Sequence, residues 1–136
     1  MKFDTKITVV LRDDLPVWQQ LNMTAFLVSG IASTNDGVTG ENYEDGSGNC
    51  YLPMFVQPVL IFGASAEQLR EVYERALSQH VKFAIFTEEL FSTGHDEVNR
   101  AAVKAVPSEA LKVTGLALRE NKKVVDQIVK GLALHK

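Results

Sequence analysis

The chain is poor in cysteine and has no surplus of basic residues, and each shortage excludes a class of protein. Its single cysteine, Cys50, cannot form an internal disulfide and is typical of a reducing compartment. The 17 acidic residues outnumber the 14 basic ones, so the net charge is −3. A protein that holds many phosphates needs a basic surface. Extended nucleic-acid binding is therefore disfavoured.

No stretch of the sequence is apolar enough to act as a secretion signal or to cross a membrane. The first residues, MKFDTK, lack the apolar core of a signal peptide. Residues 15–35 carry no charge, but they contain too many amide and hydroxyl side chains for a span of about 20 mostly apolar residues. We expect a cytoplasmic protein. Its 136 residues suit one domain that buries about two-thirds of its unfolded surface.

Motifs for cofactors, metals and covalent catalysis are missing as well. There is no GxxxxGK, GxGxxG, GxSxG or CxxC, and the three histidines form no HxxxH pair. Two weaker options remain, and each has a plainer interpretation. Cys50 could meet a histidine through the fold, or it is simply a loop thiol. The acids around residues 36–45 could hold a hard cation, or they form a solvated acidic loop. We expect no cofactor and no metal.

The pattern of apolar residues predicts alternating strands and helices. The predicted strands cover residues 4–11, 59–62, 81–86 and 111–118. The predicted helices run from residue 16 to 32, capped by Asp14 and largely enclosed, and then over 66–79, 96–106 and 122–131. Ser65 and Gln68 form a capping box, and Asn121 caps the last helix. Residues 34–50 form a long loop, in which the turn at residues 45–48 could start a hairpin.

This order of elements predicts a single α/β domain covering residues 1–136. We expect a mixed, mostly parallel four-stranded sheet with helices on both faces, joined by right-handed crossovers.

Two groups of residues could bind a ligand. Arg12, Asp13 and Asp14 follow the first strand, at the edge where ligands collect in open α/β sheets. Asn22 is the one amide on the central, most apolar stretch of the following helix, where it either presents itself to a ligand or bonds a backbone carbonyl inside the core. Lys122 and Lys123 begin the last helix, where free N–H groups favour an anion; the alternative is a solvated lysine pair.

Three segments resemble the type II peptidyl-tRNA hydrolases. VLRDDL at residues 10–15 is similar to the opening of that family, and ASAEQLREVYERAL at 64–77 with HVKFAIF is similar to its second helix and third strand. GLALRENKKVVDQIVKGLALHK at 115–136 resembles the closing strand and helix. The resemblance implies the same mixed sheet and often a dimer.

The residues that carry the chemistry of that family differ here. Leu21 or Asn22 stands where the family has a lysine, and Thr87 where it has an aspartate. The chain looks more like a bacterial branch of uncharacterised proteins with this fold, a domain-of-unknown-function family. It resembles them in DLPxxxxLN (Asp14 to Asn22), in the pair Asp45-Gly46 and in KKxVD from Lys122.

The sequence therefore favours an uncharacterised protein that binds a small ligand, with an anion as one option. The expected cleft lies at the end of the first strand and involves Arg12, Asp13, Asp14, Asn22, Asp45, Lys122 and Lys123. One alternative is a hydrolase of peptidyl-tRNA or a related ester, with Arg12, Asp13, Asn22 and Thr87 in a rearranged site. The other is a homodimeric interaction module.

Overall fold

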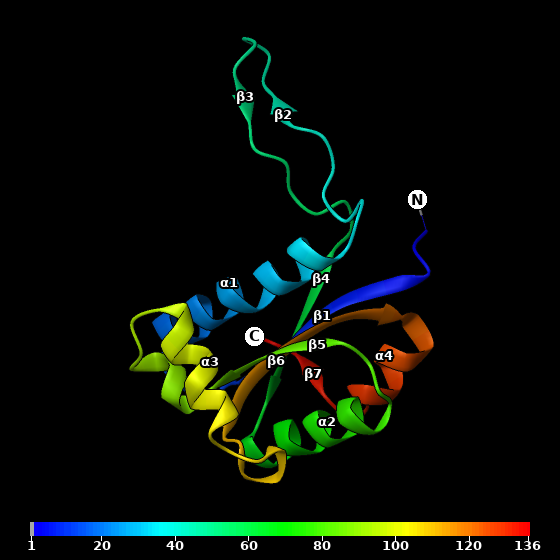
Figure 1. Ribbon diagram of the computed structural model, residues 1–136. Helices are drawn as coiled ribbons and strands as arrows, with labels where there is room; N and C mark the ends of the chain where they lie inside the picture. The colour runs from blue at the N-terminus through cyan, green and yellow to red at the C-terminus, as the bar shows by residue number, and fades with distance from the viewer. Residues whose placement is uncertain (1) are drawn as a thin grey trace.

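The computed structural model describes residues 2–136 and builds them around one five-stranded sheet (Figure 1). The order of the strands across the sheet is β5-β6-β1-β4-β7. Their bounds are β1 Thr5–Arg12, β4 Val59–Ala64, β5 Phe83–Thr87, β6 Val113–Asn121 and β7 Ala133–Leu134. The domain is α/β, as the sequence predicts.

The prediction of a four-stranded, mostly parallel sheet is wrong. In the described sheet only β1 and β4 are parallel neighbours, and the other three pairings are antiparallel. The connection between β5 and β6 explains the difference from the prediction. Its helix α3 (Asp96–Lys104) packs on the 3-10 turn η1 (Glu88–Phe91) beside the sheet and does not cross over the sheet. The chain passes through a second 3-10 turn, η2 (Ser108–Ala110), and returns antiparallel. The short β7 adds the fifth strand.

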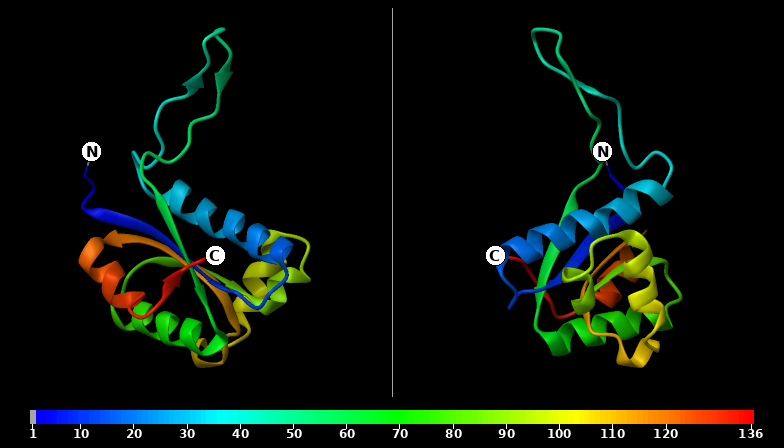
Figure 2. Two further views of the ribbon diagram at one scale, coloured as in Figure 1. Left: turned by 180° about the vertical axis from the view of Figure 1, so that it is seen from behind. Right: turned by 60° about the vertical axis from the view of Figure 1, so that its left-hand side comes forward.

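Helices cover both faces of the sheet, as predicted. Helix α1 (Val17–Thr34) lies on one face, and α2 (Ala66–Ser78) and α4 (Lys122–Ile128) lie on the other (Figures 1 and 2). A hydrophobic core lies on each face of the sheet, and alternate residues of β1 pack into one or the other. Val9 packs under α1, and Val10 packs under α2 and α4. A strand buried on both faces explains the continuous apolar run in the sequence.

The prediction that the first helix is largely enclosed is wrong. Only Gln20, Met23, Leu27 and Ile31 of α1 are buried. Trp18 is 61% exposed and Asn22 also faces solvent, so Asn22 needs no partner in the core. The helix therefore presents a partly apolar outer face.

Two of the three predicted helix caps are confirmed. Ser65 and Gln68 form the capping box of α2, and the Asn121 side chain accepts a hydrogen bond from the N–H of Lys123. Asp14 does not cap α1, because its carboxylate turns back to Arg12 instead.

The predicted hairpin is confirmed, and it stands away from the body of the molecule (Figures 1 and 2). Strand β2 (Tyr43–Glu44) pairs with β3 (Cys50–Tyr51), and Asp45 closes the turn between them. We call residues 39–56 the arm. Its two sides are joined lower down by the bridge between Thr39 and Phe55.

None of the helices in residues 2–136 has the length and apolar character that crossing a membrane requires.

Candidate functional site

Three strands end at one edge of the sheet, the edge where the sequence predicts a site. β1 and β4 are parallel, and β5 runs the same way because both β1 and β5 are antiparallel to β6. Arg12 ends β1, Asp13 and Asp14 follow it, and Glu88 follows β5. We call these four residues the strand-end cluster.

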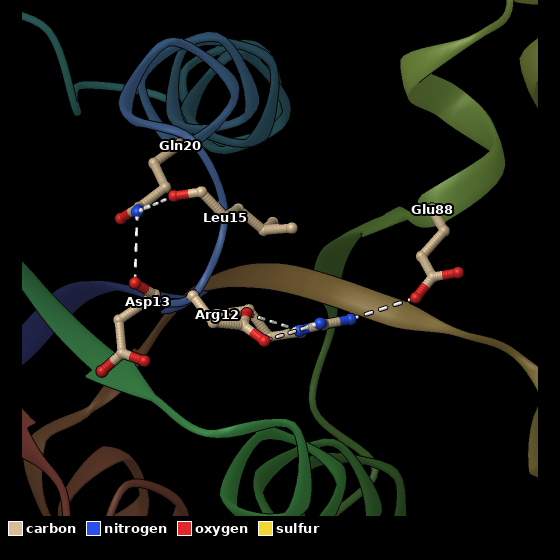
Figure 3. Close-up of polar contacts among 6 residues, drawn as sticks. Arg12, Asp13, Leu15, Gln20 and Glu88 are labelled. Atoms are coloured by element: carbon tan, nitrogen blue, oxygen red, sulfur yellow. Dashed lines mark hydrogen bonds and ion pairs between the residues drawn. The ribbon is translucent and has the colours of Figure 1, made fainter.

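Arg12 is held by two carboxylates in this cluster (Figure 3). Its Nε and Nη2 donate to the two carboxylate oxygens of Asp14 at 3.0 and 2.9 Å, and its Nη1 donates to Glu88 Oε1 at 3.0 Å. The hydrogen bonds from Arg12 lower the pKa of Asp14, and the same contacts raise the pKa of Arg12. The guanidinium is therefore already neutralised by the protein.

Gln20 ties the start of α1 to the end of the chain. Its Nε2 donates to the carbonyl of Leu15 at 2.7 Å and points toward the carbonyl of Asp13 (Figure 3). Its Oε1 faces the Nε2 of His135, which lies near the end of the chain. The backbone N–H of His135 donates to the carbonyl of Ile61 at 2.8 Å, which extends the β4–β7 pairing.

The charge of the strand-end cluster argues against an anion there. Arg12 is the one cation among its four residues, against the carboxylates of Asp13, Asp14 and Glu88. The charge of Arg12 is already paired with Asp14 and Glu88, and Asp13 is exposed beside it. An anion arriving at this edge would be repelled by the remaining negative charge.

The structure does not bring the other predicted residues to this edge. Asn22 lies on the outer face of α1, and Asp45 lies at the far end of the arm. Lys122 and Lys123 start α4, which follows the end of β6 and so lies at the opposite edge of the sheet. Their backbone N–H groups already donate to Asp4 and Asn121, and α4 has only 7 residues.

A hollow of about 730 Å³ lies at that opposite edge, on the face that α1 covers. We call it the Arg119 hollow. The end of α1 and its C-cap provide Thr34 and Asn35, the end of β6 provides Arg119 and Glu120, and the segment between α2 and β5 provides His80 and Lys82. Its volume is within the range of small-molecule sites.

Arg119 is half-buried in this hollow and donates hydrogen bonds to two neutral side chains. Its Nη1 donates to Asn35 Oδ1 at 3.2 Å and its Nε to Gln57 Oε1 at 3.3 Å. Within residues 2–136 no carboxylate forms an ion pair with it. A guanidinium has five N–H donors, so three are left for a ligand.

Two amides, one of them buried, fix the position of this arginine. Gln57 is 6% exposed, and its Nε2 donates to the carbonyl of Thr5 at 3.0 Å. The Nδ2 of Asn35 donates to the carbonyl of Ile31 at 2.8 Å. Both amide oxygens are thereby directed toward Arg119, which is held in place without being neutralised.

His80 adds a backbone feature to the same hollow. Its φ is +55°, the one positive value among the described residues other than glycine. Histidine tolerates this left-handed conformation better than most residues, yet glycine adopts it at lower cost. His80 follows Gln79, the C-cap of α2, and its N–H donates to the carbonyl of Leu77, so this conformation ends the helix.

Sequence reasoning missed Arg119, Lys82, His80, Asn35 and Gln57. One signal was available: Arg119 follows the buried run at residues 114–118, two positions after Ala117, and so lies on the α1 face of β6. Its partners Asn35 and Gln57 are 84 and 62 residues away, and no local pattern connects them.

The described residues contain no cluster of three His, Cys, Asp or Glu side chains that could hold a metal ion.

The fold and the hollow together define a small α/β protein with a half-buried arginine at one edge of its sheet that pairs with no carboxylate of residues 2–136. The chain belongs to the family described as "protein of unknown function (DUF2000)", whose model matches residues 5–136. It is similar to the solved structure of the protein of unknown function Atu0240 from Agrobacterium tumefaciens strain C58, with 46% identity and a TM-score of 0.96. That match covers 99% of this chain and 100% of the other. No curated protein matches the chain.

Proposed function

We propose that this protein binds a small organic anion, recognised through a carboxylate or phosphate group, in the Arg119 hollow. The observation that carries the proposal is the half-buried guanidinium of Arg119, which is positioned by two amides and paired with no carboxylate of residues 2–136. Arginine is the preferred side chain for such groups because its planar donors match two oxygens at once.

The charges around the hollow favour an anion by a narrow margin. Arg119 and Lys82 contribute two positive charges and Glu120 one negative charge. The C-terminal end of α1 adds about half a negative charge. A unit charge at 4 Å from Arg119 would gain about 4 kcal/mol near a protein surface, before the cost of desolvation. We therefore expect affinity in the millimolar range.

Calorimetric titration with sodium acetate and with sodium phosphate tests the proposal. We expect saturable binding of at least one of them to the unmodified protein, and a loss of at least tenfold in affinity in Arg119→Gln. Lys112→Gln is the matched control, because it removes one exposed positive charge at the other end of β6. Equal affinities in both variants, or no binding to the unmodified protein, would overturn the proposal.

A second candidate function is self-association, and exposed apolar surface favours it. Trp18 on α1 is 61% exposed and Leu52 on the arm is 83% exposed. Their exposed neighbours are Val17 and Leu21 on α1, and Tyr51, Met54 and Val56 on the arm. The arm stands away from the body, so it leaves the outer face of its own α1 open (Figure 2).

The chain exposes more surface than a compact monomer of its mass, and this favours a second copy of the chain as the partner. The exposed area is 8698 Å², whereas a compact monomer of 15.0 kDa exposes about 7,000 Å². The excess of roughly 1,700 Å² exceeds the ~800 Å² that each partner contributes to a standard interface. Because one chain supplies both apolar surfaces, a two-fold pair with each arm on the other copy's α1 would bury both.

Sedimentation velocity tests this candidate. We expect a dimer at micromolar concentration and a monomer for Leu52→Glu, whose site is too exposed to affect folding. Val98→Glu, on exposed α3, is the control and should remain dimeric. A monomeric unmodified protein, or a Leu52→Glu variant that stays dimeric, would contradict the arrangement.

Hydrolysis of peptidyl-tRNA and a fold of the type II peptidyl-tRNA hydrolases stay predictions that rest on the resemblance of the sequence. A cleavage assay with no turnover above buffer would remove the activity. A cytoplasmic location also stays a prediction, to be checked by fractionation of cells.

A further inference from the structure

An apolar groove adjoins the Arg119 hollow. It lies between α1 and α3, with the edge strand β5 as its floor, and encloses about 580 Å³. Its apolar lining comes from Phe26 and Leu27 of α1, Phe86 of β5, Leu90 of η1 and Val103 of α3. We call it the α1–α3 groove. Phe26 is 55% exposed although its ring lies 5.9 Å from that of Phe86, so the groove has an accessible apolar wall.

The groove and the hollow meet at two small residues. Gly30 of α1 and Ala84 of β5 line both of them. A Cβ placed on Gly30 would lie 3.5 Å from the Cβ of Ala84, which is ordinary van der Waals contact. Helix α1 and strand β5 therefore approach each other closely here, and neither position carries a bulky side chain in the passage between the two spaces.

We infer that the anion bound in the Arg119 hollow is the carboxylate end of an amphipathic molecule whose unbranched apolar chain lies in the α1–α3 groove. This inference rests on the function proposed above. Thr34 in the hollow and Phe26 in the groove are separated by about 12 Å along the axis of α1. That distance suits a medium-chain carboxylate in extended form.

The cations at the far end of the groove do not favour the opposite orientation, in which the carboxylate lies in the groove and the apolar chain in the hollow. Arg100 lies there but forms an i,i+4 ion pair with Asp96, and Lys104 is exposed. Arg119 is the better-buried cation and is paired with no carboxylate of the described chain. The charged end of the ligand is therefore assigned to the hollow and the apolar chain to the groove.

Calorimetric titration with acetate, butanoate, hexanoate and octanoate tests the inference on the full chain. Each added CH₂ that is buried tightens binding by up to about fourfold, so we expect a steady rise in affinity along the series. Arg119→Gln should weaken every member by tenfold or more. Lys104→Gln should leave the series unchanged.

Two variants test the path of the chain. Gly30→Val should block the passage, so that octanoate binds no more tightly than acetate to this variant. Phe26→Asp, at a half-exposed position that tolerates a polar residue, should have the same effect without touching the passage. The two variants do not depend on each other, so failure of one to fold leaves the other decisive.

The outcomes separate the two proposals. Equal affinity for all four carboxylates would refute the apolar chain in the groove and leave the anion site in place. Absence of binding by every carboxylate and by phosphate would refute both. A rise in affinity that survives Gly30→Val and Phe26→Asp, or that is lost in Lys104→Gln, would place the chain or its charged end elsewhere and refute the inference.

Discussion

The amide of Asn35 joins the end of α1 to the guanidinium of Arg119. Its oxygen accepts from Arg119 Nη1 at 3.2 Å, and its nitrogen donates to the carbonyl of Ile31 at 2.8 Å. A neutral side chain at this point keeps the arginine in place and leaves its charge available. A carboxylate at the same point would neutralise it, as Asp14 does for Arg12.

Asn35→Asp is therefore predicted to abolish anion binding while Arg119 itself is unchanged. The new carboxylate would lie within ion-pairing distance of the guanidinium and occupy the place of the ligand's charge. Asn35→Ala is the control, because it removes the amide but adds no negative charge, and we expect it to retain part of the affinity. Titration with acetate measures both. An Asn35→Asp protein that binds acetate as the unmodified protein does would contradict the role given to Arg119.

His80→Gly is predicted to raise the stability of the protein and to weaken anion binding. Glycine adopts a φ of +55° without the steric cost that histidine pays, so the free energy of unfolding should rise by about 0.5–1 kcal/mol. The same change removes a side chain from the rim of the Arg119 hollow, and anion affinity should fall about twofold to fivefold. Urea unfolding and calorimetry give the two values. A variant that is less stable than the unmodified protein would show that the side chain stabilises the turn.

Gly115→Ala tests the packing of α1 on β6. A Cβ at this position would lie 2.7 Å from the Sδ of Met23, 3.1 Å from Leu27 and 3.2 Å from the backbone oxygen of Val10. We expect a loss of about 1–3 kcal/mol in the free energy of unfolding, measured in urea. Gly46→Ala, where nothing lies within 4 Å, is the matched control and should change little.

Asp45 is predicted to make the arm sensitive to acid. Hydrogen bonds from Tyr51 Oη at 2.7 Å, from the N–H groups of Asn49 and Ser47 and from the Asn49 amide lower its pKa from 3.8 to about 2. Since the folded pKa is depressed, the carboxylate stabilises the turn above pH about 4. That contribution is lost as pH falls toward 2. Tyr51→Phe should move the pKa back toward 3.8.

A ¹³C titration of the Asp45 carboxyl group follows this change directly. A midpoint near 3.8 in the unmodified protein would contradict the hydrogen-bonded turn.

The positions of most helices and strands could be read from the sequence because local signals specify them. The continuous apolar run of β1, the Ser65–Gln68 box and the Asp45–Gly46 turn each act within a few residues. The direction of β6 could not be read in this way. A strand buried on both faces looks the same whether its neighbours are parallel or antiparallel, and the position of α3 beside the sheet decides between them.

The candidate site was harder to predict for two physical reasons. The apolar sequence of α1 indicates burial, but half of its surface is left open, and a sequence cannot show which half. The anion site depends on Arg119 meeting Asn35 and Gln57 from distant parts of the chain. By contrast, Arg12, Asp13 and Asp14 are consecutive in the sequence and were easy to select. The charge of Arg12 is nevertheless neutralised by ion pairs with Asp14 and Glu88.

The most direct measurement is an NMR titration of the arginine Nε–Hε groups with acetate, in which Arg12 serves as an internal reference. Arg119 Nε donates to a neutral amide, and Arg12 Nε donates to the carboxylate of Asp14. The account predicts a saturable shift of the Arg119 signal while the Arg12 signal stays in place. A fixed Arg119 signal, or equal shifts of both signals in proportion to added salt, would contradict it.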